Sequence, residues 1–214
     1  VPAIVPAARL PVPEAEADDR RNIGRGEGYL QKKLSSLKND ASIEIWSLDE
    51  AMFQLHGTSC KMWVPPEVRD PVVLMRPTRK AIGYFGAVRR SDGAFLVSRC
   101  EERFNAETTF EFLKVLHDLD RDRRKVVIID NARYHHAILF KDWLEKVKDE
   151  LVLLFLPPYS PELNPIERVW KLTRRSCTHN RLFADLGELA SRLDGQFEQW
   201  RNGSEALKRL CAIN

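Results

Sequence analysis

The sequence predicts an α/β fold in which helices cover both faces of a mixed, largely parallel sheet. Two segments, Lys125–Ile129 (KVVII) and Leu151–Leu156 (LVLLFL), are apolar at nearly every position, which is typical of strands buried on both faces. The stretch between them carries apolar residues at helical spacing, from Ala137 to Val147. Strands and helices that alternate in this way favour parallel strands connected by right-handed crossovers.

The length and composition of the chain indicate a globular protein. The 214 residues suffice for one domain with a substantial core and an appendage. With 43% hydrophobic and 30% charged residues, the chain has the balance of a soluble globular protein. No apolar run approaches the length of a membrane span, and the first 30 residues lack the apolar stretch of a signal peptide. We therefore expect a cytoplasmic protein without a membrane partner.

The cysteines do not indicate a metal site. Cys60, Cys100, Cys177 and Cys211 lie far apart and form no C-x-x-C pair. This spacing argues against both a zinc site and a disulfide framework. We expect four reduced thiols.

The chain begins with a segment of weak pattern. Residues 1–41 contain many Pro, Ala and acidic residues and show no clear apolar period, so we expect a poorly ordered or loosely packed N-terminal arm, with a short basic helix near its end. Ser42–Leu48 then alternates as a strand and ends on Asp49. Short strand pieces and turns are expected over residues 51–71.

A hairpin and a helix follow. Lys80–Val88 and Ala94–Cys100 are rich in Phe, Tyr, Ile and Val, and Ser91-Asp92-Gly93 between them is a hairpin turn signal. Asn105 is placed to cap a helix that runs to about His117.

The end of the chain predicts a stiff loop and three helices. The loop after the second apolar strand holds four prolines, which favours an extended backbone. Asn164 is then a good N-cap, Pro165 suits the first helical position and Glu167 lies in the first turn. A further helix is capped by Asp185, and a short one is expected in the tail, residues 202–214. Residues 42–201 would form the main domain.

Three acidic residues occupy special positions. Asp49 follows the first strand, Asp130 follows the central apolar strand, and Glu167 lies in the helix entered from the last strand. Ligand sites in open α/β sheets lie at the carboxyl ends of strands, so these carboxylates are expected to converge there. Three converging carboxylates require cations, and their hard oxygens favour Mg²⁺ or Mn²⁺. We expect two ions that together clamp a phosphodiester.

Each of these acids also has a structural explanation. Glu167 can fold back on its helix start as a capping box, and Asp49 and Asp130 can be turn-forming aspartates. Glu50 is a second choice for Asp49, from which it should point away if the strand continues. Asn131 and His135 are candidates for supporting a metal or a phosphate.

A basic surface follows the third acid. The stretch from Arg168 to Arg181 contains no Asp or Glu, and such basic side chains can track phosphates or form an ordinary solvated surface. The candidates are Arg168, Lys171, Arg174, Arg175 and Arg181.

Several motifs together resemble the bacterial insertion-sequence branch of the mariner-like DDE transposases. The resemblance rests on LDEAMFQLH (Leu48–His56), Trp63, FGAV (Phe85–Val88), ERFNAETTFEFL (Glu102–Leu113), IIDNARYHHA (Ile128–Ala137), LPPYSPELNPIERVWKLTRR (Leu156–Arg175) and THNRLF (Thr178–Phe183). It covers about residues 43–200, and the block from Leu156 to Phe183 is the most specific part.

The resemblance implies an RNase H-like fold and a Mg²⁺-dependent enzyme. Its three catalytic acids match Asp49, Asp130 and Glu167, with Asp130 and Glu167 37 positions apart (167 − 130). The implied reaction is cleavage of DNA at transposon ends and strand transfer into target DNA. The implied partners are transposon-end and target DNA and a second copy of the chain, in the bacterial cytoplasm at the nucleoid.

The family also carries a helix-turn-helix region ahead of the catalytic domain. Residues 1–41 do not show the pattern of such a region, so we expect a fragment or a remnant of it. Two other functions stay open: an RNase H-like nuclease without strand transfer, and a transposase remnant that binds DNA without catalysis.

Overall fold

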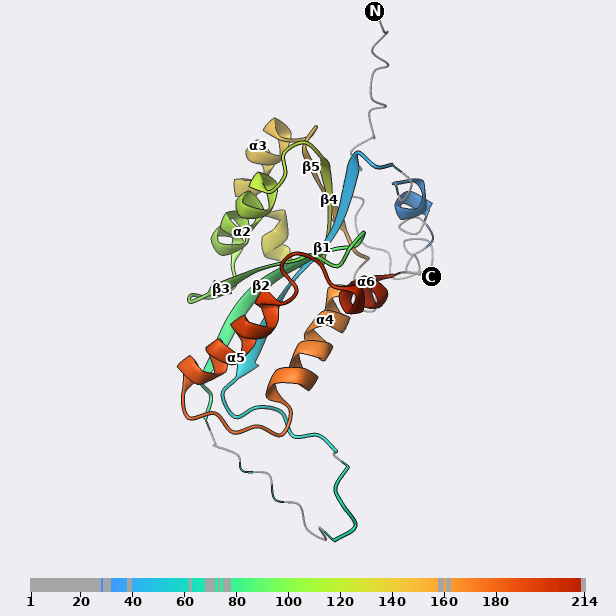
Figure 1. Cartoon of the computed structure of the whole chain (residues 1–214). Helices are drawn as coiled ribbons and strands as arrows, with labels where there is room; N and C mark the ends of the chain where they lie inside the picture. The colour runs from blue at the N-terminus through green and yellow to red at the C-terminus, as the bar shows by residue number, and fades with distance from the viewer. Residues whose placement is uncertain are drawn as a thin grey trace, which may run out of the picture.

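A five-stranded mixed sheet forms the centre of the molecule (Figure 1). The strand order is β3-β2-β1-β4-β5; β2 is antiparallel to β1 and β3, whereas β1, β4 and β5 are parallel. This arrangement confirms the predicted mixed sheet. The strands are β1 (Ile43–Gln54), β2 (Ala81–Arg89), β3 (Phe95–Cys100), β4 (Arg124–Ile129) and β5 (Leu151–Phe155).

This architecture is that of a computed structural model, which describes most of the chain after the N-terminal segment. The described residues are 28, 32–37, 40–61, 63–67, 72, 74, 78–157, 160 and 163–212. The expected N-terminal arm therefore lies largely outside the described residues. None of the helices in the described part is long and apolar enough to span a bilayer.

Helices cover the sheet on both faces, as predicted (Figure 1). One face carries α2 and α3, and the other carries α4, α5 and α6, with the helical residues 32–37 beside β4. The helices are α2 (Ala106–Asp118), α3 (Ile138–Lys146), α4 (Ile166–Thr173), α5 (Leu186–Glu198) and α6 (Glu205–Cys211).

Successive side chains of strand β1 point alternately into the two helical layers. Trp46 and Leu48 pack in the α2–α3 layer, whereas Ala51 and Phe53 pack in the layer of α4 and α5. Because successive side chains point to opposite faces, Asp49 belongs to the α4 face and Glu50 to the α2–α3 face.

The predicted end of the first strand was wrong. Asp49 was expected to follow it, but β1 continues to Gln54. The physical reason is that β1 has two partners of different length: the ladder with β4 stops at Ser47, whereas the ladder with β2 runs from Trp46 to Gln54. Asp49 lies where β1 leaves β4 and stays paired with β2.

Several predicted elements are confirmed with their caps. The hairpin of β2 and β3 is present, and the side chain of Asn105 accepts a hydrogen bond from the Thr108 amide at the start of α2. Asp185 caps α5 in the same way through the amide of Glu188. Ser204 caps the short helix α6 in the tail.

Segments outside residues 42–201 also pack on the core. Leu34 and Leu37 contribute to the cluster beneath β4, and Leu207 and Cys211 of α6 join the cluster beneath α4 and α5. The domain limits themselves remain a prediction. The four cysteines are free thiols, as expected.

Candidate active site

Asp49 and Asp130 come from neighbouring strands at matching positions. The last pair of the parallel ladder is Ser47 with Ile128, and each aspartate stands two residues after its member of that pair. Asp130 directly follows the last residue of β4. Both side chains belong by alternation to the face that α4 covers. The structure thus brings together the two aspartates that the sequence singled out.

The carboxylate of Asp49 is partly buried and surrounded by negative charge. Its Oδ2 accepts a hydrogen bond of 3.2 Å from Nε1 of Trp170 in α4. Burial is the largest cause that raises the pKa of Asp49, to about 8, and the charge of Glu50 is the next. Glu167 and Asp130 raise it further. All three predicted acids are therefore within electrostatic reach of one another.

Asp130 has a fixed cationic neighbour. Nδ1 of the buried His135 lies 2.8 Å from Oδ1 of Asp130, and its Nε2 lies 3.3 Å from Oε1 of Glu50. The amide of Ala132 also donates to Asp130. The hydrogen bond from His135 is the main reason why the pKa of Asp130 is lowered. Burial opposes the charge on His135, but its bonds to the two carboxylates raise its pKa to about 9.

A short 3-10 helix presents His135. Residues Arg133–His136 form this helix directly after the strand, and α3 begins only at Ile138. The predicted regular helix therefore starts later than the histidines. Asn131 is turned to His136, whose ring stacks on Phe155 with 4.3 Å between the ring centroids.

Glu167 lies in the first turn of α4 and is not engaged as a cap. Pro165 takes the N-cap position without any side-chain cap bond, so the predicted Asn164 cap is wrong, and the capping box that was the alternative explanation of Glu167 is not formed. The amide of Asn164 is instead buried and donates to the carbonyl of Leu48 at 3.1 Å. Within the described residues, the carboxylate of Glu167 forms no hydrogen bond or ion pair.

The donor set fits a hard divalent cation. Among the described residues, no three side chains of His, Cys, Asp or Glu converge as the ligands of one ion. Asp49 and Asp130 nevertheless offer carboxylate oxygens from adjacent strands, and Mg²⁺ is commonly held by one or two carboxylates with water. The negative charge that raises the pKa of Asp49 is the charge that such a cation would offset.

The predicted basic residues do not all remain free. Lys171, Arg175 and Arg181 are exposed. In contrast, Arg168 donates to the carbonyl of Leu210. The guanidinium of Arg174 lies over the ring of Phe53, 5.3 Å from its centroid. Arg174 begins a π-helical turn, Arg174–Thr178, that continues α4.

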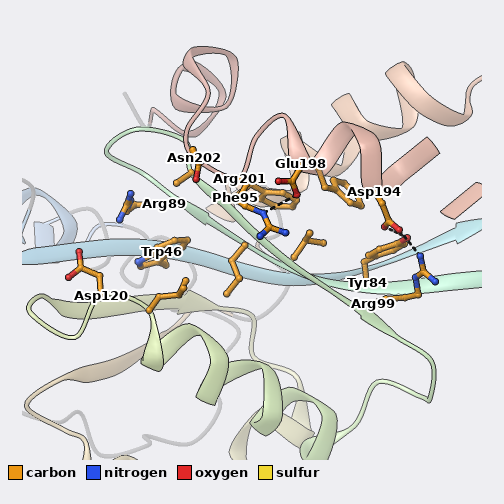
Figure 2. A pocket seen from close by; sticks show the side chains of 15 residues that line it. Trp46, Tyr84, Arg89, Phe95, Arg99, Asp120, Asp194, Glu198, Arg201 and Asn202 are labelled. Atoms are coloured by element: carbon orange, nitrogen blue, oxygen red, sulfur yellow. Dashed lines mark hydrogen bonds and ion pairs between the residues drawn. The ribbon is translucent and has the colours of Figure 1, made fainter. Parts of the chain in front are cut away.

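A cavity lies along β3, and none of the three acids lines it. Its volume is about 530 Å³, and it lies between the ends of α5 and α2 (Figure 2). Its arginines are already paired: Arg89 with Glu44 and Asp92, Arg99 with Asp194, and Arg201 with Glu198. Because carboxylates already neutralise these guanidinium groups, the cavity offers little positive charge to bind a phosphate.

Sequence reasoning missed three contacts around the acids. Trp170 contacts Asp49, Asn164 contacts Leu48, and Glu50 contacts His135. The spacing Asn164-x-x-Glu167-x-x-Trp170 was a usable signal, because residues three apart share a helix face. Nothing in the sequence pairs Glu50 with His135, which are 85 positions apart.

Comparisons with known proteins identify the family of this chain. The model of the DDE superfamily endonuclease family matches residues 44–190. The uncharacterized protein y4pE/y4sA of Sinorhizobium fredii is 36% identical over 110 residues, which are 50% of this chain and 76% of that protein. The transposable element Tc1 transposase of Caenorhabditis elegans is 29% identical over 178 residues, which are 76% of this chain and 59% of the Tc1 protein.

Solved structures show the same fold. Mos1 mariner paired end complexes with Mn and with Mg align with TM-scores of 0.64 and 0.59 at 20% identity. The alignments cover 96% of this chain but only 62% and 64% of the Mos1 chains, so this chain spans less than two thirds of Mos1, as of Tc1. Together with the strand order, they confirm the predicted RNase H-like fold.

The family match spans all three acids and most of the sheet. A relative at 36% identity, of which this chain covers more than two thirds, accompanies it. The chain belongs to the DDE superfamily endonuclease family.

Proposed function

We propose that this chain is the catalytic domain of a DNA transposase, which cleaves DNA at transposon ends and transfers the strands into target DNA. The observation that carries the proposal is the position of Asp49 and Asp130. Asp49 in β1 and Asp130 directly after β4 are within electrostatic reach of each other, on the face where α4 brings Glu167 within the same reach. Carboxylates so placed serve metal-assisted phosphodiester chemistry better than they serve a core.

Asp49, Asp130 and Glu167 are the proposed ligands of two Mg²⁺ or Mn²⁺ ions. Ions held there would supply Lewis-acid activation of a water or 3′-hydroxyl and stabilisation of the leaving oxygen. The residues of the chain supply anionic oxygens at fixed places. No covalent protein nucleophile is required.

His135 is the proposed positioning residue for Asp130. Its buried ring is held on one side by Glu50 and binds Oδ1 of Asp130 on the other, which fixes that carboxylate oxygen in place. Asn131 would support the same loop through its contact with His136.

The exposed Lys171, Arg175 and Arg181 are the proposed contacts to the phosphates of DNA. Arg168 and Arg174 would contribute charge from positions fixed by Leu210 and Phe53. The Mos1 paired end complexes support transposon-end DNA as the partner class. Because two ends must be processed together, we expect a homodimer.

The decisive experiment is nicking of supercoiled plasmid DNA with Mg²⁺, with Mn²⁺ and with EDTA. Asp130→Asn and Glu167→Gln should each abolish metal-dependent nicking. Asp149→Asn, an exposed acid in the turn after α3, is the matched control and should nick like the wild type. Full activity in both active-site variants would overturn the assignment of these acids.

A second assay separates the related functions. An oligonucleotide with a free 3′-hydroxyl should be joined to plasmid DNA by a transposase, and the joined product is detected by sequencing. Nicking without any joined product identifies a nuclease. Binding of DNA without nicking identifies a remnant.

A further inference from the structure

The segment Asn164-x-x-Glu167-x-x-Trp170 attaches α4 to strand β1 at two adjacent residues. Nδ2 of Asn164 donates to the carbonyl of Leu48 at 3.1 Å, and Nε1 of Trp170 donates to the carboxylate of Asp49 at 3.2 Å. Glu167 lies midway between the two attachment points in sequence. The turn that carries the third acid is therefore fixed directly to the strand that carries the first.

We propose that Asn164 and Trp170 are positioning residues for the metal site, an inference that rests on the proposed function. Asn164 sets the place of the first turn of α4 against β1. Trp170 holds the carboxylate of Asp49 in one orientation by donating to its Oδ2.

The indole of Trp170 is suited to this role because its own position is fixed. The side chain is 1% exposed and contacts the rings of Phe53, Phe95 and Phe197, with centroid distances of 6.0, 5.6 and 6.3 Å. Such aromatic packing leaves a buried ring little freedom to change rotamer. The N–H group is therefore presented to Asp49 at a defined point.

A glycine in strand β2 leaves room for this ring. Gly86 pairs directly with Asp49, and a Cβ atom at Gly86 would lie 2.5 Å from Cη2 of Trp170. A glycine at this position allows the six-membered ring of the indole to lie against the strand. Phenylalanine at position 170 would satisfy the aromatic cluster but would bring no N–H to Asp49.

The chemical need for this donor follows from the surroundings of Asp49. Asp49 is half-buried on the face that α4 covers, and its carboxylate accepts from the indole of Trp170, so the groups that bind this carboxylate decide its orientation. A hydrogen bond to a charged group stabilises and orients that group. Partners of ligating carboxylates commonly change metal affinity by about 10–100-fold when they are removed.

Asn164 uses its amide for attachment rather than for capping. It is 3% exposed, and its Oδ1 has no partner among the described protein atoms. Asn164→Asp keeps the shape of the side chain but, when ionised, loses the donor to Leu48. This variant tests the attachment without opening a cavity.

The test measures Mn²⁺ binding to the full chain by electron paramagnetic resonance, together with the melting temperature. Trp170→Phe and Asn164→Asp should each weaken Mn²⁺ binding by about 10-fold or more. Trp200→Phe, in the same aromatic cluster, is the matched control and should change only the melting temperature. Unchanged Mn²⁺ affinity in Trp170→Phe overturns the proposal.

A second measurement keeps the inference testable if Trp170→Phe does not fold. It compares NMR spectra of the metal-free wild type and the metal-free Asp49→Ala variant. The substitution should shift one of the five tryptophan indole N–H resonances far more than the other four. Unmoved resonances overturn the attachment, whatever the metal affinity. A moved resonance in a protein that binds no Mn²⁺ supports the attachment and overturns the proposed function.

Discussion

Asp49 is the residue at which burial and charge most strongly oppose ionisation. Its pKa is raised from an ordinary value of 3.8 to about 8. Between these two values the folded protein keeps a proton that the unfolded chain releases, so this group favours unfolding more as the pH rises. The group thus lowers stability at neutral pH for as long as no cation offsets it.

Asp49→Asn should therefore stabilise the metal-free protein. In EDTA at pH 7–8 we expect an increase in the free energy of unfolding on the order of 2 kcal/mol, which disappears below about pH 4. Thermal unfolding across this pH range provides the measurement, with Asp149→Asn as control. Added Mg²⁺ should raise the melting temperature of the wild type but not that of Asp49→Asn. A wild type that is more stable than the variant at pH 8 in EDTA would contradict the expectation.

In contrast to Asp49, His135 lies where its charged form is favoured, because it is buried between two carboxylates. Its pKa is raised from 6.5 to about 9, so its contribution to stability is fully present below pH 6.5 and is lost as the pH rises through about 9. Removing it also leaves Glu50, whose side chain is 7% exposed, without that partner.

His135→Gln should cost about 1–3 kcal/mol of folding free energy at pH 6, and the loss should shrink at pH 9.5. Urea unfolding at both pH values measures the difference. His136→Gln, the exposed neighbour, is the control. An equal loss at the two pH values would show that the ring acts by packing rather than by charge.

At the scale of elements, the site depends on how α4 is seated between β1 and β2. The helix continues into a π-helical turn, and the loop that follows is fixed to the chain after β1. There Asn180, with φ of 53°, exchanges hydrogen bonds with the backbone of Cys60. Both ends of this unit are thus attached to the β1 segment.

Gly86 and Trp170 should be energetically coupled across this contact. Gly86→Ala places a Cβ against Cη2 and Cζ2 of Trp170 and should destabilise the protein by about 1–3 kcal/mol through overpacking. Phenylalanine lacks those two atoms, so Gly86→Ala should cost clearly less in the Trp170→Phe background. A double-mutant cycle of unfolding free energies measures the coupling. Strict additivity would mean that the strand and the indole adapt independently.

At the scale of the molecule, the two helical layers have different roles. The α2–α3 layer packs on the even-numbered side chains of β1, whereas Asp49 faces the layer of α4. The exposed Lys171 and Arg175 extend from that same layer. DNA is therefore expected on the α4 side of the sheet.

Lys171→Gln should weaken DNA binding in a salt-dependent way. Loss of one phosphate contact should lower the slope of log K against log salt by about 1. Lys114→Gln is the control, since Lys114 lies on α2 and is paired with Glu111. Fluorescence anisotropy with duplex DNA at several salt concentrations provides the measurement. Equal slopes for the two variants would place DNA elsewhere.

Local patterns were enough to predict most of the elements. The buried strands β4 and β5, the β2–β3 hairpin and the caps Asn105 and Asp185 follow from periodicity and turn chemistry, which act over a few residues. The wrong predictions concern features that depend on residues far away in the sequence. The length of β1 depends on β2, and the amide of Asn164 binds Leu48, 116 positions away, instead of its own helix.

The sequence by itself determined the order of strands and helices along the chain and singled out Asp49, Asp130 and Glu167, because acids at the edges of apolar segments are visible in the pattern. Only the tertiary structure decided what surrounds them: His135 and Glu50 beside Asp130, and Trp170 against Asp49 over Gly86. The reason is physical. Hydrophobic periodicity reports which face of an element is buried, whereas hydrogen bonds between residues about a hundred positions apart depend on distances that exist only once the sheet and α4 have packed.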